Sequence, residues 1–255
     1  MKVGRCIFCG KAGDLTSEHP MSKPVLDLAG FDLDDVSIEL DRPVEEITLE
    51  YVAERISTIR DEVVTCVCAK CNNEWMQKLD ASFAGTIDRW VRHPAHRLGP
   101  TGLAVVRRYL AKVLWVRLLG EDWASTPIEN GVLSVDVLLN PRFGDSIRRD
   151  EMVDLTKHLC VGAAQIEPNS IFTYAAFTPG VRGQPSRSGI RRFSGGLVVA
   201  LPALRLQLWL VYRFKPTMTV AWPRSVSWLG PGSRFSQLRP APLKPQIDDV
   251  VLRVS

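Results

Sequence analysis

Long apolar runs are missing from the 255-residue sequence. A transmembrane helix needs roughly 18 or more predominantly apolar residues. The most apolar stretch, residues 197–212, is interrupted by Pro202, Arg205 and Gln207. The first residues also lack the apolar segment of a secretion signal. We therefore expect a folded cytoplasmic protein without a membrane span.

Several catalytic signatures are also missing. The sequence contains no Walker-type glycine loop, no dinucleotide-binding fingerprint and no nucleophile elbow. These absences argue against P-loop nucleotide hydrolysis, nicotinamide chemistry and α/β-hydrolase chemistry.

Acidic residues are scarce in the last part of the chain. Residues 181–255 hold 12 basic and 2 acidic side chains, whereas residues 1–80 hold 9 basic and 16 acidic ones. Twelve of those acidic residues fall within 27–62. Such segregation predicts that one part of the folded surface contacts a polyanion while another repels it.

Four of the six cysteines form two Cys-x-x-Cys knuckles, Cys6 with Cys9 and Cys68 with Cys71. In a reducing compartment, two such knuckles predict one tetrahedral structural Zn²⁺. Cys66 is an alternative ligand, but a spacing of one residue does not permit the tight knuckle. Cys160 stands alone and is typical of a small core residue.

The pattern of apolar residues predicts an α+β fold. The elements that it predicts are a hairpin over 2–16, helices over 44–60, 73–91, 101–119 and 149–159, and strands over 61–65, 132–139, 171–178, 197–200, 204–214 and 217–222. Asn72 or Asn73 is the expected N-cap of the second helix. We expect a long loop over 180–196 and a proline-rich tail packed over the sheet. The domains predicted are a zinc module (1–92) with an acidic insertion at 27–62, a helical connector (93–124) and an antiparallel β domain (125–255).

Between the knuckles lies Glu18-His19-Pro20, and Asn72 directly follows the last cysteine of the second knuckle. This order resembles the HNH endonucleases, whose zinc-bearing treble-clef core is the ββα-metal fold. Leu15-Thr16 before Glu18, and Trp75-Met76 after Asn72, also look like a set of uncharacterised bacterial and phage proteins. The resemblance covers about 80 residues, in pieces.

The resemblance implies a metal-dependent endonuclease that hydrolyses phosphodiester bonds of DNA, or of RNA. By the family's pattern, Glu18 and Asn72 would bind the catalytic Mg²⁺ or Mn²⁺, and His19 would be the general base. The chemistry of these residues agrees, because imidazole titrates near pH ~6.5 and carboxylate and amide oxygens are hard ligands.

Two departures from the family pattern leave another interpretation open. Glu18 stands where the family more usually has Asp. The family also has an Asn between the His and the second knuckle, but no Asn precedes Asn72 in this sequence. Asp61 is the candidate to replace it. Met76, one turn after Asn72, is unsuited to a hard ion. The alternative is a treble clef that keeps zinc and binds nucleic acid or a protein partner without cutting. In a third interpretation, residues 27–60 mimic nucleic acid and cover the site.

Basic residues predict where nucleic acid binds. On the helix predicted over 101–119, the basic residues share the side opposite the apolar stripe, which we expect to be exposed. With arginines of the 180–196 loop they predict a phosphate-binding surface made by Arg107, Arg108, Lys112, Arg117, Arg187, Arg191 and Arg192. Trp75, Trp90 and Trp115 fit the apolar stripes and are expected in the core.

Overall fold

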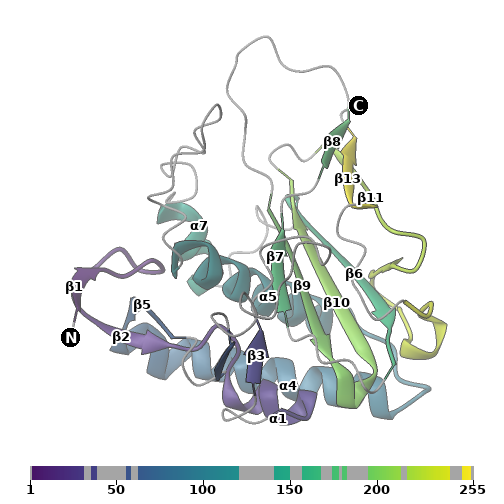
Figure 1. Cartoon of the computed structure of the whole chain (residues 1–255), viewed down its shortest axis with the longest axis horizontal. Coiled ribbons are helices and arrows are strands. Elements are labelled where there is room, and N and C mark those ends of the chain that lie inside the picture. Colours follow the sequence, from purple (N-terminus) through teal and green to yellow (C-terminus); the bar gives the residue numbers. More distant parts are fainter. Residues whose placement is uncertain are drawn as a thin grey trace.

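The computed structural model describes residues 2–31, 36–38, 56–58, 63–120, 141–149, 157–167, 174–177, 180–182, 195–213, 217–241 and 249–253. Two groups of strands lie apart, with helices beside and between them (Figure 1). The mixed α+β class predicted from the sequence is confirmed. No helix in the described part of the chain is long and apolar enough to cross a membrane.

The N-terminal sheet carries both cysteine knuckles. It has the order β1-β2-β5, made of β1 (Lys2–Arg5), β2 (Ala12–Glu18) and β5 (Val64–Cys68), and all of its pairs are antiparallel. The first knuckle lies in the turn between β1 and β2, which confirms the predicted hairpin. Strand β5 begins three residues later than the strand predicted over 61–65 and runs up to the second knuckle.

The helix after β5 begins earlier than predicted. It runs through α3 (Ala69–Cys71), a π-helical turn (Asn72–Met76) and α4 (Gln77–Arg92). Cys68 occupies the N-cap position of α3, so the expectation that Asn72 or Asn73 is the N-cap is wrong. The knuckle itself forms the first helical turn, which puts Asn72 inside the helix. The other helices are α1 (Lys23–Ala29), α5 (Pro100–Gly120) and α7 (Pro141–Arg149).

The C-terminal part is built on a five-stranded antiparallel sheet of order β12-β6-β10-β9-β7. Its strands are β6 (Leu159–Gln165), β7 (Tyr174–Phe177), β9 (Gly195–Leu201), β10 (Leu206–Tyr212) and β12 (Ser227–Trp228). A smaller sheet contains β8 (Gly180–Arg182), β11 (Thr219–Ala221) and β13 (Val251–Arg253), in which β13 pairs with β8 in parallel. Short strands β3 (Val36–Ile38) and β4 (Ile56–Thr58) pair with each other.

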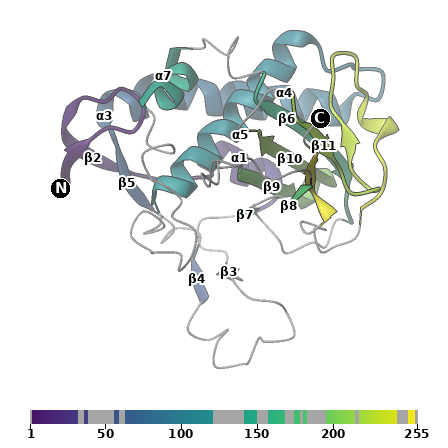
Figure 2. The same ribbon diagram turned by 90° about the horizontal axis from the view of Figure 1, so that it is seen from above.

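Helix α5 joins the two main sheets into one core. It contacts β5 on one side and β9 and β10 on the other, and it lies between the sheets in both views (Figures 1 and 2). One apolar cluster runs from Phe8 in the first knuckle through Val113 of α5 to Leu208 of β10. The other face of the five-stranded sheet is covered by the segment around Met218 and Val226, as expected for the tail. The apolar core therefore crosses all three predicted domains, whose boundaries stay a prediction.

Some predicted elements differ from the structure. The helix expected over 149–159 is not helical at residues 157–159, because Leu159 begins strand β6, and residues 150–156 lie outside the described residues. Strand β6 was not predicted, since its Gly162, Ala163 and Ala164 are poor strand formers that Val226 and the neighbouring strands cover. The helix expected over 44–60 is not helical at Ile56–Thr58. The rest of that helix, the strand over 132–139 and the loop residues 183–194 lie outside the described residues.

Helix α7 packs unusually close to the first knuckle. A Cβ built on Gly144 would lie 2.1 Å from the carbonyl oxygen of Ile7. Arg108 of α5 holds the far end of α7, because its Nε donates to the Ile147 carbonyl and its Nη2 to the Arg148 carbonyl, each over 2.7 Å. These arginine contacts satisfy carbonyl groups that the end of a helix leaves unpaired. Helix α7 is thereby attached to the cysteine-bearing turn.

The Gly144 contact can be tested by adding one methyl group. Gly144→Ala should destabilise the protein by about 1–3 kcal/mol, because the new Cβ overlaps the Ile7 carbonyl. Gly85→Ala, inside α4 with no atom within 4 Å of the new Cβ, is the matched control and should stabilise by about 0.5–1 kcal/mol. Urea unfolding measures both. Equal stabilisation by the two substitutions would contradict the packing of α7 on the knuckle.

Candidate functional site

Four cysteines converge between the β1–β2 turn and the start of α3. The Sγ atoms of Cys6, Cys9, Cys68 and Cys71 all lie within 4.8 Å of one another. The Cys9 and Cys68 sulfurs are 3.7 Å apart, and all six cysteines of the chain are free thiols. A tetrahedral Zn²⁺ with Zn–S bonds of about 2.3 Å places its sulfurs roughly 3.8 Å apart. The predicted ligand set thus has the spacing that a metal ion such as zinc requires.

The backbone of the first knuckle shapes this cluster. The Gly10 amide donates to the Cys6 carbonyl over 2.8 Å, and the Cys6 amide donates to the Lys11 carbonyl over 3.0 Å. Gly10 adopts φ of 70°, which favours glycine at this turn. Cys66, the alternative ligand, is outside the cluster of four, and its carbonyl accepts the Ile7 amide over 3.1 Å. Cys66 therefore joins the knuckle to β5 through its backbone.

The thiols influence one another strongly. A hydrogen bond from Cys71 lowers the pKa of Cys6 to about 4, and the same contact raises the pKa of Cys71. Binding of a metal ion by four thiolates would displace the thiol protons.

Asn72 contacts the end of strand β2. Its side-chain nitrogen donates to Thr16 Oγ1 over 3.3 Å and to the Ser17 carbonyl over 3.4 Å. Glu18 and His19 are the next residues along the chain. The second knuckle therefore brings the predicted amide ligand to the strand that leads into the predicted acid and base.

Glu18 is directed into the protein, where a lysine binds it. Its Oε1 lies 3.0 Å from Nζ of Lys112, and the same ammonium lies 3.1 Å from Oδ1 of Asp80. Lys112 is fully buried, and Glu18 and Asp80 are 7% and 5% exposed. Burial lowers the pKa of Lys112, but the charges of Asp80 and Glu18 together outweigh it and raise that pKa. This group of one cation and two carboxylates, the Lys112 ion group, links β2, α4 and α5.

Buried polar groups follow Glu18 and border the Lys112 ion group. His19 Nδ1 is buried without a hydrogen-bond partner in the described part of the chain. Burial and the nearby charges of Asp80 and Glu18 raise the pKa of Tyr109 well above its usual value, although contact with Ser22 opposes this rise.

Known proteins give no further assignment. No protein-family model, no curated protein and no solved structure matches this chain. The site must therefore be interpreted from its own residues.

The basic residues predicted on α5 do not form an exposed face. Lys112 is fully buried, so its predicted place on the exposed side is wrong. Arg107 and Arg117 are half-buried, and burial lowers the pKa of Arg107. Arg108 binds α7 and lies with Cζ 5.3 Å from the centre of the Trp75 ring. The reason is that α5 packs against α4, α7 and both sheets, which leaves little of it facing solvent. Arg187, Arg191 and Arg192 lie outside the described residues.

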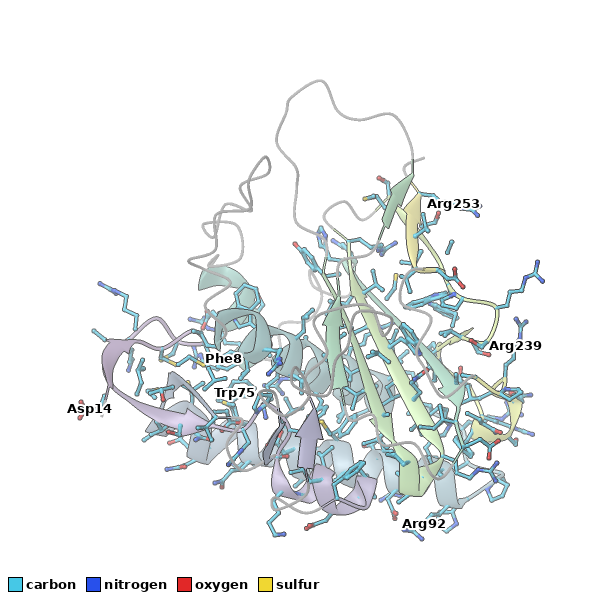
Figure 3. The ribbon with its side chains drawn as sticks, in the orientation of Figure 1. Phe8, Asp14, Trp75, Arg92, Arg239 and Arg253 are labelled. Carbon is cyan, nitrogen blue, oxygen red and sulfur yellow. The ribbon has the colours of Figure 1, made fainter. Side chains whose placement is uncertain are left out.

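A cavity of about 510 Å³ opens beside the cysteines, between the knuckles and α7. Charged residues and Trp75 line it, among them Lys11, Lys70, Asp145, Arg148 and Arg149. Arg148 and Arg149 both pair with Asp145. Trp75 also meets Phe8 edge-on, and both lie near the N-terminal sheet (Figure 3). None of Glu18, His19 and Asn72 is among the residues that line this cavity.

The sequence did not predict the Lys112 ion group. Lys112 stands in a helix with other basic residues, and nothing in its spacing distinguishes a buried lysine from a solvated one. Asp80 was a weak indication of a buried cation. It lies next to Leu79 on the apolar stripe of α4, and a buried carboxylate needs a partner.

The metal site predicts a dependence on individual cysteines. The purified chain should contain one Zn²⁺, and Cys71→Ser should lose it together with the fold of the N-terminal sheet, because three thiolates do not complete the site. Cys160→Ser is the matched control and should keep both. Elemental analysis and circular dichroism measure the two properties. Full zinc content in Cys71→Ser would refute this ligand set.

Removing the buried ammonium should be costly. Lys112→Met should destabilise the protein by about 3–5 kcal/mol, because Glu18 and Asp80 then remain buried without a cation. Adding Glu18→Gln and Asp80→Asn to that variant should restore most of the loss. Lys78→Met, an exposed lysine of α4, is the control and should be near neutral.

The same ion group predicts a pH dependence. Because the folded-state pKa of Lys112 is raised, its contribution is complete below the unfolded lysine pKa of about 10.4 and is lost as pH rises through the folded value. Urea unfolding between pH 7 and 11.5 should show this alkaline loss in the wild type and a smaller one in Lys112→Met. A Lys112→Met protein with wild-type stability at both ends would exclude the ion group.

Proposed function

We propose that this protein is a metal-dependent nuclease of the HNH type, which hydrolyses phosphodiester bonds of DNA or RNA. The observation that carries the proposal is the contact of Asn72 with Thr16 and Ser17, which brings the residue after the last cysteine to the strand that precedes Glu18-His19.

The order of elements supports the same proposal. Strands β2 and β5 pair antiparallel, and β5 leads directly into the helix that begins at Ala69. This strand, strand and helix succession beside the four cysteines supports the ββα-metal arrangement that the resemblance implies. The acidic insertion predicted at 27–62 falls between β2 and β5.

His19 is the proposed general base. It directly follows β2 and is half-buried, and its Nδ1 lacks a hydrogen-bond partner in the described part of the chain. Within the described residues, the ring is therefore not engaged by another protein group at Nδ1, and a neutral imidazole can accept the proton of a water molecule that attacks a phosphorus atom.

The donors near His19 also fit a hard divalent ion. Asn72 Oδ1 and Glu18 Oε2 are the oxygens that would hold it, because Oε1 of Glu18 already accepts from Lys112. When bound, Mg²⁺ or Mn²⁺ supplies positive charge for the leaving 3′ oxygen. Lys112 fixes the position of Glu18 and reduces the negative charge available there. Lys112 is thus a positioning residue for the proposed ligand Glu18.

A second function is favoured by one observation. The pairing of Glu18 with a fully buried lysine satisfies the carboxylate without a metal ion. If the Glu18–Lys112 ion pair never opens to admit a metal ion, the protein would be a zinc module that binds nucleic acid or a protein partner without cutting it.

Cleavage by matched histidine variants tests the proposal. The wild type should cut DNA with Mg²⁺ or Mn²⁺ and stop with chelator, and His19→Ala should lower the rate about 10²- to 10⁴-fold through loss of the base. His93→Ala, an exposed histidine directly after α4, should cut like the wild type.

Zinc content and thermal unfolding of His19→Ala should match the wild type, which separates loss of chemistry from loss of fold. Equal cutting by His19→Ala and wild type would reject the mechanism. A wild type that binds nucleic acid and never cuts duplex, branched or single-stranded DNA, or RNA, would establish the second function instead.

A further inference from the structure

The C-terminal part of the chain contains a long segment without acidic residues. Residues 168–247 hold eleven Lys or Arg side chains and neither Asp nor Glu. The described portion 217–241, which packs over one face of the five-stranded sheet, includes Arg224, Arg234 and Arg239. A surface with basic side chains and no carboxylates within its own segment attracts polyanions.

Trp228 is an exposed aromatic ring within this segment. It lies on β12, at the edge of the five-stranded sheet, and is 59% exposed. Among the described residues, the exposed large apolar side chains are Trp228 and Val63. A tryptophan this exposed is not explained by the packing of the core.

The six-membered ring of the Trp228 indole packs against Gly230. A Cβ built on Gly230 would lie 2.2 Å from Cζ3 and 2.4 Å from Cη2 of Trp228, and Gly230 itself is buried. A side chain at position 230 would therefore require the ring to move. The ring contacts Gly230 but is 59% exposed, and an exposed aromatic ring offers a surface on which a base can stack.

Two arginines are fixed near the turn that leads into β12. Nη1 of Arg239 donates to the carbonyl of Arg224 over 2.9 Å, and both residues are exposed. The Val226 amide donates to the Pro223 carbonyl over 2.9 Å, so Arg224 lies in a tight turn just before Trp228. Arg239 projects outward at the opposite side of the molecule from Phe8 and Trp75 (Figure 3).

We propose that Trp228, Arg224 and Arg239 form a binding surface for single-stranded nucleic acid, here named the Trp228 surface. A base stacks on the open face of Trp228, and the arginines contact neighbouring phosphates. The base must be unpaired, because a base within a duplex has both faces covered by its neighbours.

The same features argue against a lipid surface as the partner. Membrane association needs several apolar side chains that enter the bilayer together. Trp228 is a single ring pressed onto Gly230, and Val63, the other exposed large apolar residue of the described part, belongs to the segment before β5. A basic segment with one exposed aromatic ring instead suits a single nucleic-acid strand, in which phosphates and bases alternate.

Oligonucleotide binding by the full, zinc-loaded chain tests the Trp228 surface. Fluorescence anisotropy with a labelled 20-nucleotide oligothymidylate, in buffer without Mg²⁺ or Mn²⁺, should show binding that Trp228→Ala weakens about 10-fold or more. Trp228→Phe should retain most of the affinity, because phenylalanine still stacks. Gly230→Ala should weaken binding as well, since its methyl group displaces the ring.

Charge variants give the second half of the experiment. Arg224→Gln with Arg239→Gln should weaken binding and reduce the slope of log affinity against log salt by about 1.4, for two lost phosphate contacts on a single strand. Lys23→Gln with Lys78→Gln removes the same charge from exposed positions on α1 and α4 and should change neither. Circular dichroism confirms that each variant is folded.

The outcomes separate the alternatives. Wild-type affinity in both Trp228→Ala and the double arginine variant overturns the Trp228 surface. Tighter binding of the wild type to duplex than to single-stranded DNA would also overturn it. The same holds if Trp228→Ala weakens binding only to vesicles of anionic phospholipid and not to the oligonucleotide. The inference goes beyond the proposed nuclease activity, because binding is measured without Mg²⁺ or Mn²⁺ and does not depend on whether the wild type cuts.

Discussion

The convergence of four cysteine sulfurs within 4.8 Å is the constraint on which the N-terminal half depends. It fixes the β1–β2 turn to the first turn of the long helix, although these segments are about 60 residues apart in sequence. Helix α7 then packs on the same turn through Gly144, and Asn72 reaches the end of β2. The cysteine cluster therefore lies where the elements of this half meet, next to residues proposed to act in hydrolysis.

A second constraint is the buried ammonium of Lys112. It satisfies Glu18 and Asp80 and so ties β2 and α4 to α5, the helix that contacts both main sheets. A buried cation with two carboxylates is stable only as a complete group. For the proposed chemistry this means that Glu18 cannot move freely toward a divalent ion, and its reach is set by Lys112.

The sequence predicted the parts of the fold that have strong local signals. Knuckle spacing gave the four ligands, and the apolar spacing gave α4 and α5 with Trp90 and Trp115 in the core. It did not predict β6, whose small residues suit a strand only because Val226 covers Gly162. Nor could it predict that Lys112 is buried, because that depends on α5 being enclosed by elements distant in sequence. The exposure of Trp228 depends likewise on the place of β12 at the edge of the five-stranded sheet.

Together these features describe a four-cysteine unit on one side of the molecule, where Phe8 and Trp75 lie, and a basic segment with Arg239 on the other (Figure 3). Helix α5 contacts both main sheets. The central claim is that one metal ion closes the N-terminal unit through Cys6, Cys9, Cys68 and Cys71. X-ray absorption at the zinc edge of the purified protein tests it most directly. The account predicts four sulfur neighbours at about 2.3 Å. A shell containing nitrogen or oxygen ligands, or fewer than four sulfurs, would contradict it.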